Sequence, residues 1–173
     1  TEGRVILCSS FSKTLSSALR VGWLAPGRYR ERVEHMKYVG TASTTTLTQL
    51  AIAEFIKQGY YDRHIRTIRQ HYRSNFHLAT EAVRVHFPEG TRVSAPEGSY
   101  FLWVELPGDI DTLDLNEQLE QHKIQIAPGV IFSVSGKYRN CMRLNYAKPI
   151  PDEAMRVIGE EVRVLLSRLL APL

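Results

Sequence analysis

The chain has 173 residues, which is long enough for one domain with a hydrophobic core or for two small lobes. Its 43% hydrophobic and 23% charged residues are typical of a soluble globular protein, and a formal net charge of +4 is too small to indicate nucleic-acid binding by itself. The sequence contains no apolar run long enough to span a membrane. Its two cysteines, Cys8 and Cys141, lie inside apolar runs, which indicates reduced thiols in a cytoplasmic protein rather than a disulfide framework.

The first elements predicted are two short strands joined by a polar loop. Residues 4–8 have the length and the β-branched content of a short buried strand. Residues 9–17 are rich in hydroxyl side chains, as in a loop at the carboxyl end of that strand. A second strand is predicted within residues 19–26 and ends at Pro26 and Gly27. The chain opens at Thr1 and enters the apolar run at once, so we expect it to be a fragment of a larger protein.

Helices are predicted to follow. Residues 28–59 have a helical pattern in two pieces, interrupted at 39–46 by glycine and threonines that disfavour a helix. Residues 60–87 are predicted to form a long amphipathic helix with an apolar stripe of Ile65, Ile68, Tyr72, Phe76 and Ala79. Its arginines lie mostly off that stripe, so we expect them to be solvated or paired: Arg63, Arg66, Arg69 and Arg73.

The second half of the sequence predicts an α+β lobe. The expected elements are two strands within 91–107 around the turn "APEG", a helix over 111–123, strands over 124–132 and 141–147, and a helix over 151–170. The fold class predicted is therefore α/β, with an α+β lobe packed against the remnant of an α/β domain. The domain division predicted is a remnant over 1–60, a connecting helix over 61–90 and a small domain over 91–173.

The segment "SSFSKTLSSALRVGW" carries the candidate chemistry. A lysine becomes nucleophilic when burial or a second cation disfavours its ammonium form. If the chain reverses between Lys13 and Arg20, both side chains can face one pocket beside the hydroxyls of Ser10 and Ser12. A cation, hydroxyls and loop amides suit a phosphate, and an amine beside a phosphate suggests pyridoxal phosphate. The alternative from composition alone is a solvated serine-rich turn.

This segment resembles the active-site lysine segment of the aminotransferase class I and II group, which are pyridoxal-phosphate enzymes of fold type I. The shared pattern is Ser-x-Ser-Lys followed by an arginine and Gly-Trp. The resemblance implies that Lys13 binds the cofactor covalently and moves a proton between substrate and cofactor, while Ser10, Ser12 and Arg20 hold the phosphate. It also implies that the chain is the carboxyl-terminal portion of that fold, with residues 1–60 belonging to the large cofactor-binding domain.

Further motifs in the same order extend the resemblance: "APEGSYFLWVEL", "IAPGVIFS" and "NCMRLNYA". The last would carry the arginine that binds the substrate carboxylate, Arg143. Alternation in "CMRLNYA" independently sets Arg143 on the face opposite Met142, Leu144 and Tyr146. An arginine in an apolar strand needs an anionic partner, so the alternative is an internal ion pair with an acidic side chain.

The loop "TLSSALR" lacks the proline and glycine that common aminotransferases carry there, and it resembles the MocR subfamily of GntR-type bacterial transcription regulators. The stretch "GYYDRHIRTIRQHYRSNFHLATEAV" resembles the matching helix of those regulators. This resemblance implies a cytoplasmic homodimer that senses an amino acid or amine effector and binds DNA through a winged-helix domain absent from these residues. The alternatives are a fragment of a genuine aminotransferase acting on α-amino acids and a cofactor-free structural remnant.

The cofactor site is expected to be incomplete in this sequence. In the family, the groups that pair with the pyridine nitrogen, stack on the ring and bond the phenolic oxygen precede the lysine. We therefore expect the fragment alone to bind pyridoxal phosphate weakly or not at all. The six histidines form no adequate ligand set, so no metal site is predicted.

Overall fold

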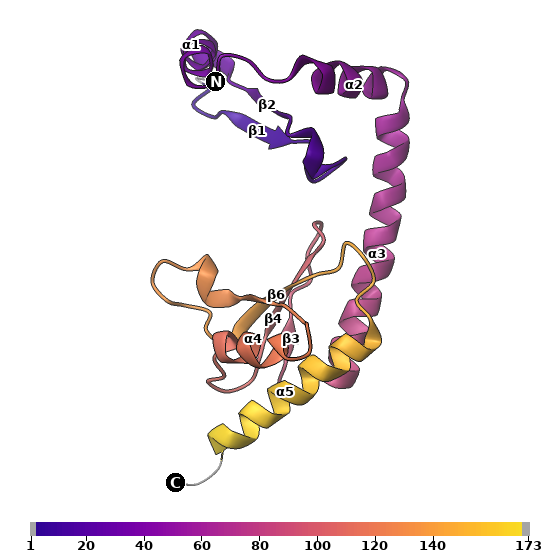
Figure 1. Cartoon of the computed structure of the whole chain (residues 1–173), viewed down its shortest axis with the longest axis vertical. Coiled ribbons are helices and arrows are strands. Elements are labelled where there is room, and N and C mark those ends of the chain that lie inside the picture. Colours follow the sequence, from indigo (N-terminus) through magenta and orange to yellow (C-terminus); the bar gives the residue numbers. More distant parts are fainter. Residues whose placement is uncertain (1–2, 171–173) are drawn as a thin grey trace. The chain divides into compact units, whose positions relative to one another are not determined.

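The fold, taken from a computed structural model, is described for residues 3–170. The chain divides into two compact units, residues 1–67 and residues 68–173, and each is described by itself. Helix α3 (Tyr60–His86) contributes residues to both units, as the ribbon in Figure 1 shows. The three-part domain division expected from the sequence stays a prediction.

Unit 1 contains an antiparallel hairpin of β1 (Leu7–Ser10) and β2 (Gly22–Ala25), in which Leu7 pairs with Ala25 and Ser10 with Gly22. The prediction of a buried strand over 4–8 was wrong in position and in burial. The strand begins at Leu7, and Leu7 is 59% exposed. The hairpin is two-stranded and exposed along nearly its whole length, so its apolar residues are not covered as they would be inside a complete sheet.

Two helices follow the hairpin in unit 1, α1 (Arg30–Thr41) and α2 (Thr46–Lys57). The predicted interruption within 39–46 is confirmed, although Gly40 and Thr41 still belong to α1. The break occurs at Ala42, whose φ of +53° lies in the left-handed region that a helix cannot continue through. Gly59, with φ +72°, makes the next reversal before α3.

Unit 2 is built on a four-stranded antiparallel sheet with the order β3-β4-β6-β5. Its elements beyond α3 are β3 (Arg92–Val93), β4 (Phe101–Glu105), α4 (Thr112–Glu120), β5 (Ala127–Pro128), β6 (Cys141–Asn145) and α5 (Asp152–Leu170). The predicted pair of strands around "APEG" and the strand carrying Arg143 are confirmed.

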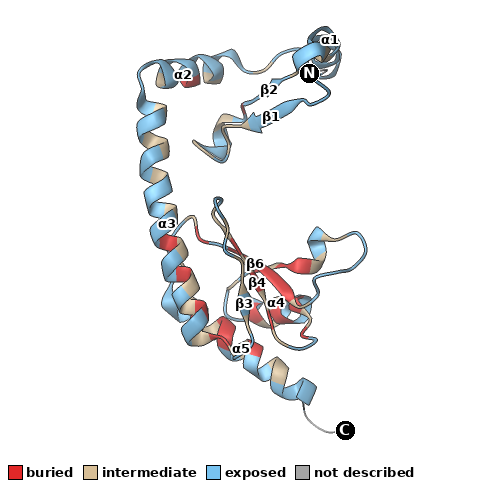
Figure 2. Cartoon of the chain, turned by 180° about the vertical axis from the view of Figure 1, so that it is seen from behind, coloured by how far each residue is buried: buried red, intermediate tan, exposed pale blue. Residues whose placement is uncertain are grey.

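One face of this sheet forms the core. Leu102 and Val104 of β4 lie opposite Leu144 and Met142 of β6, and these side chains are buried. Helices α3, α4 and α5 add further core residues, in segments coloured red in Figure 2: Ala79, Val83, Leu115, Leu119, Met155, Ile158 and Val162. The predicted alternation is therefore confirmed, and it leaves the other face of β4 and β6 for polar and aromatic side chains.

The predicted strand over 124–132 was wrong for most of its length. Only Ala127 and Pro128 pair with β6, and residues Gly129–Phe132 form a 3₁₀ helix. Proline cannot donate a ladder hydrogen bond, and a Cβ at Gly129 would lie 2.3 Å from the carbonyl oxygen of Tyr138. The tight packing at Gly129 turns the chain away from the sheet.

The long helix α3 is confirmed, and its arginines Arg63, Arg66, Arg69 and Arg73 are exposed. Its apolar stripe is half-buried at Tyr72 and Phe76 and buried at Ala79. Within residues 3–170 no helix combines the length and the hydrophobicity needed to cross a membrane.

Candidate functional site

The loop that carries Lys13 follows β1 directly and is closed by backbone hydrogen bonds. The Phe11 amide donates to the carbonyl oxygen of Val21 (3.0 Å), and the Leu15 amide donates to the carbonyl oxygen of Phe11 (2.8 Å). These bonds wind residues 11–15 into a turn whose Lys13 side chain is exposed. The turn gives Lys13 a defined position at the end of the β1–β2 hairpin.

Arg20 returns the chain to the same end of the hairpin. The Ser16 hydroxyl accepts a hydrogen bond from the Ala18 amide, which begins a short 3₁₀ helix (Ser17–Leu19). Arg20 follows with φ +50° and ψ +32°, a left-handed conformation that directs the backbone into β2. The chain reversal that joins Arg20 to the Lys13 loop is thus present in the structure.

Gly22 keeps the two strands close beside this loop. A Cβ on Gly22 would lie 2.9 Å from the carbonyl oxygen of Ser9, so a larger residue would push β2 away from β1. Ser10 pairs with Gly22 and is the last residue of β1. Ser10, Ser12, Lys13 and Arg20 therefore gather at one end of the hairpin.

Helix α3 anchors the Lys13 loop from the side. The Nε2 atom of His64 lies 2.8 Å from the carbonyl oxygen of Thr14, and the rings of Phe11 and Tyr61 meet edge to face at 5.9 Å. This role of His64 was not predicted from the sequence, in which the histidines were candidates only for metal ligands. Within residues 3–170 no three His, Cys, Asp or Glu side chains lie close enough together to hold a metal ion.

The free hydrogen-bonding groups of this loop fit a phosphate. Among residues 3–170 the side chains of Ser10, Ser12, Lys13 and Arg20 make no hydrogen bond or ion pair. The Thr14 hydroxyl oxygen is buried and has no partner in the same part of the chain. A buried hydroxyl without a partner is costly, so the loop has polar capacity that a bound anion can satisfy. Two cations and these hydroxyls match the phosphate of pyridoxal phosphate.

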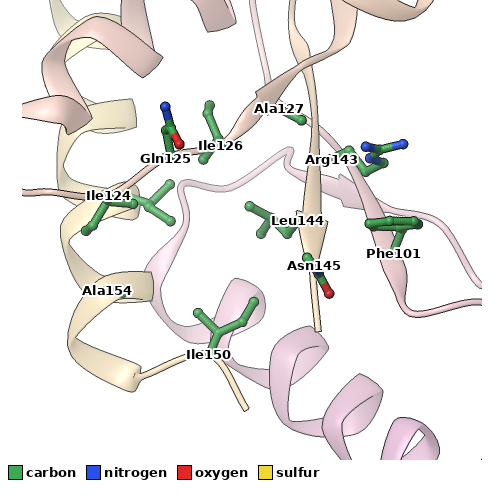
Figure 3. A pocket seen from close by; sticks show the side chains of 11 residues that line it. Phe101, Ile124, Gln125, Ile126, Ala127, Arg143, Leu144, Asn145, Ile150 and Ala154 are labelled. Carbon is green, nitrogen blue, oxygen red and sulfur yellow. The ribbon is translucent and has the colours of Figure 1, made fainter. Parts of the chain in front are cut away.

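Arg143 belongs to unit 2 and is positioned by β6. It pairs with Trp103 of β4 on one side and with Ala127 of β5 on the other. Its Cζ atom lies 4.1 Å from the centroid of the Phe101 ring and 4.4 Å from that of Phe132. Figure 3 shows the guanidinium lying flat against Phe101.

The expected alternative for Arg143, an internal ion pair, is not present among residues 3–170. Aromatic rings contact the flat face of the guanidinium through cation–π attraction and leave its N–H edges for hydrogen bonds. A planar carboxylate is the group that such edges bind with two parallel bonds. The geometry of Arg143 therefore suits carboxylate binding.

A cavity of about 340 Å³ lies beside β6 and includes Arg143 in its wall. Figure 3 shows Leu144, Ile126 and Ile150 directed toward the space on one side of β6, whereas the guanidinium extends on the other side. The wall is mixed, with the amide side chains of Gln125 and Asn145 among apolar residues. Arg143 thus contributes to the wall of a mixed cavity, while its guanidinium lies on the other side of β6 beside Phe101.

An aromatic cluster that was not predicted from the sequence lies beside Arg143. The ring of Trp103 meets Phe132 at 5.7 Å and Tyr138 at 5.5 Å, both edge to face. Phe132 is 42% exposed and Tyr138 is 50% exposed. The motif "IAPGVIFS" already contained Phe132, but its contact with Arg143 depends on the turn at Gly129, which the strand prediction did not include.

Comparison with known proteins places this chain in a family. The family model for aminotransferase class I and II matches residues 1–159. An uncharacterized HTH-type transcriptional regulator of Escherichia coli (strain K12), YjiR, is 48% identical over 164 residues, covering 93% of this chain and 35% of the regulator. This chain therefore spans about a third of the length of that relative.

Solved structures agree with the family model. The multiple substrate aminotransferase from Thermococcus profundus has a TM-score of 0.86 and 32% identity, covering 97% of this chain and 43% of that one. The α-aminoadipate aminotransferase LysN from Thermus thermophilus, complexed with N-(5'-phosphopyridoxyl)-L-leucine, has a TM-score of 0.85 and 27% identity. The match covers 95% of this chain and 43% of the LysN chain. The fold is a portion of the pyridoxal-phosphate-dependent transferase fold, and the chain belongs to the aminotransferase class I and II family.

Proposed function

We propose that this chain is the carboxyl-terminal portion of the aminotransferase-like, effector-sensing domain of a bacterial transcription regulator in the cytoplasm. The observation that carries this proposal is the 48% identity over 164 residues to an HTH-type regulator, against 32% to the Thermococcus aminotransferase. DNA recognition then falls to a helix-turn-helix domain outside residues 1–173, and the working form is a homodimer.

The Lys13 loop would hold the cofactor in this proposal. Ser10, Ser12 and Arg20 would bind the phosphate, because their donors have no other partner in the described chain. Pyridoxal phosphate, when bound, supplies an aldehyde that reacts with primary amines and a ring that withdraws electrons from the attached carbon. Lys13 would be the residue that holds the cofactor covalently, and its Nζ atom would hold or release a proton at that site.

Arg143 would select the effector by its carboxylate. Phe101 and Phe132 orient the guanidinium without neutralising its charge, so the positive charge remains available to an anion. Arg143 would therefore favour an effector that carries a carboxylate over an amine that lacks one.

The test uses the full-length protein that carries this chain and measures operator-DNA affinity with and without amino compounds. Lys13→Ala should abolish both the visible absorbance of the lysine-bound cofactor and the effect of amino compounds on DNA affinity. Lys37→Ala, an exposed lysine of α1, is the matched control and should change neither. An unchanged absorbance and DNA response in Lys13→Ala would contradict the proposal and support a cofactor-free role.

A second candidate function is transamination of α-amino acids, which the similarity to the multiple substrate aminotransferase favours. The same residues would serve, since proton movement by Lys13 and carboxylate binding by Arg143 are needed in both cases. Keto-acid formation from added amino acids separates the two functions. Multiple turnovers of keto-acid formation by a full-length protein that has no helix-turn-helix domain would favour the enzyme over the regulator.

A further inference from the structure

A second cavity, of about 480 Å³, lies in unit 2 between helix α3 and the loop 96–99. It shares no lining residue with the cavity beside Arg143. Its wall includes two arginines, one glutamate and three aromatic side chains: Arg69, Arg73, Glu97, Tyr72, Phe76 and Tyr146. Neither the family's lysine motif nor its carboxylate-binding arginine contributes to it.

The α3 wall of this cavity is positively charged. Arg69 and Arg73 are four residues apart on α3, so they project from the same side of the helix. Both are exposed, and neither makes an ion pair within residues 3–170. Two free guanidinium groups one turn apart suit a carboxylate, which accepts paired hydrogen bonds from such forks.

Aromatic side chains line the cavity next to these arginines. The Phe76 ring lies 5.8 Å from the Tyr146 ring, and the Tyr72 ring lies 5.5 Å from Tyr100. Tyr146 is only 3% exposed, whereas Tyr72 and Phe76 are half-buried and keep part of their surface free. Aromatic walls of this kind favour a ligand with a ring, through offset or edge-to-face contacts.

The loop opposite α3 is tied to the helix through Tyr146. The Tyr146 hydroxyl donates to the carbonyl oxygen of Ser99 (3.2 Å), and Asn75 Nδ2 donates to the carbonyl oxygen of Tyr146 (3.0 Å). These bonds hold the loop that carries Glu97 against α3, so the cavity is largely formed before a ligand arrives. The Glu97 carboxylate, exposed and without an ion pair among residues 3–170, can accept hydrogen bonds from an ammonium group.

We propose that this cavity is a non-covalent binding site for a free aromatic α-amino acid. Its carboxylate binds Arg69 and Arg73, its ammonium binds Glu97, and its ring packs against Tyr72, Phe76 and Tyr146. No lysine lines the cavity, so this binding needs no cofactor. The site gives the proposed effector-sensing domain a second place to bind an amino acid, and it stands independently of the chemistry at Lys13.

The test is calorimetric titration of the full chain, without added cofactor, with L-phenylalanine, 3-phenylpropionate and phenethylamine. L-Phenylalanine should bind saturably and more tightly than either analogue, because each analogue lacks one charged group. Arg69→Ala or Arg73→Ala should weaken L-phenylalanine binding by about tenfold or more, the usual effect of losing a charge-assisted hydrogen bond. Glu97→Gln should weaken binding of L-phenylalanine but not of 3-phenylpropionate.

Three control variants separate this site from the others. Arg84→Ala removes an exposed arginine of the same helix outside the cavity, and Lys13→Ala and Arg143→Ala remove the residues of the proposed function. Arg84→Ala should bind L-phenylalanine as the unmodified chain does, and Lys13→Ala and Arg143→Ala should each retain saturable L-phenylalanine binding in the absence of cofactor. Absence of saturable binding, unchanged binding in both Arg69→Ala and Arg73→Ala, or loss of binding in Arg143→Ala would overturn the proposal.

Discussion

The Cζ atom of Arg143 lies 4.1 Å from the centroid of the Phe101 ring, although the two residues come from different strands. The register of β4 and β6 produces this contact, because Phe101 pairs with Asn145 and Trp103 pairs with Arg143. A ring attracts a guanidinium without neutralising it, so Arg143 is held in place while its charge stays available.

Substitutions at Arg143 and Phe101 should weaken carboxylate binding to different extents. In the cofactor-loaded full-length protein, Arg143→Lys should raise the Kd for an α-amino acid by about tenfold or more, because an ammonium group lacks the planar fork. Phe101→Leu should raise that Kd by only about threefold, since it removes one cation–π contact. Arg163→Lys, at an exposed position on α5, should change nothing. Equal Kd values in all variants would rule out carboxylate binding by Arg143.

The Cys141 thiol should make the chain less stable at alkaline pH. Burial and the nearby Glu105 carboxylate raise the pKa of the Cys141 thiol above its ordinary value. The stabilisation is complete below the ordinary thiol pKa and is lost as the pH rises through the raised pKa, because the unfolded state releases the proton first.

Urea unfolding at a series of alkaline pH values measures this effect. Cys141→Ala should flatten the fall of the unfolding free energy with pH, whereas Cys8→Ala, at an exposed position, should leave it as it is. Burial also raises the pKa of Tyr146. We therefore expect a further fall of the unfolding free energy at still higher pH, in the unmodified chain and in both cysteine variants. Identical pH slopes with and without the Cys141 thiol would contradict the prediction.

Two glycines should respond to alanine in opposite directions. A Cβ at Gly159 of α5 would lie 2.1 Å from the carbonyl oxygen of His86, so Gly159→Ala should push α5 from the end of α3 and lower the unfolding free energy by about 2 kcal/mol or more. Apart from the chain neighbours and backbone of its own helix, no atom of residues 3–170 lies within 4 Å of such a Cβ at Gly40 of α1, and Gly40→Ala should stabilise that helix by roughly 0.5–1 kcal/mol. Denaturant titration of both variants gives the comparison; a loss of stability in Gly40→Ala as large as in Gly159→Ala would refute it.

The hydroxyl of Thr112 should contribute measurably to stability. Its Oγ1 atom is buried and lies 2.8 Å from the carbonyl oxygens of both Arg139 and Cys141, which joins the start of α4 to the start of β6 and to the turn before it. Thr112→Val keeps the shape but leaves those carbonyls without this donor, at a cost of about 1–3 kcal/mol. Thr112→Ser retains the donor and should lose less in thermal unfolding. A valine variant as stable as the serine variant would show that the hydroxyl is dispensable.

Local patterns predicted the elements whose residues are close in sequence. The alternation in "FLWVE" and "CMRLN" predicted the buried side chains of β4 and β6 except Cys141, because a strand turns successive side chains to opposite faces whatever its partners are. Cys141 is buried although it lies on the face opposite Met142 and Leu144. The strand prediction failed over 124–132, where Gly129 packs against the backbone of Tyr138 and Cys141. Contacts between distant segments leave no periodic pattern, so that turn could not be predicted from the residues themselves.

The sequence by itself predicted a polar loop around Lys13 between two short strands, and the structure supplied the chain reversal that brings Arg20 back to the same end of the hairpin. The sequence also determined that Arg143 lies on the strand face opposite the core. Only the tertiary structure decided that the partners of Arg143 are the rings of Phe101 and Phe132 rather than an acidic side chain, and that His64 anchors the Thr14 carbonyl. These contacts depend on strand register and helix packing. Register and packing result from many weak interactions between distant segments, so no single position in the sequence specifies them.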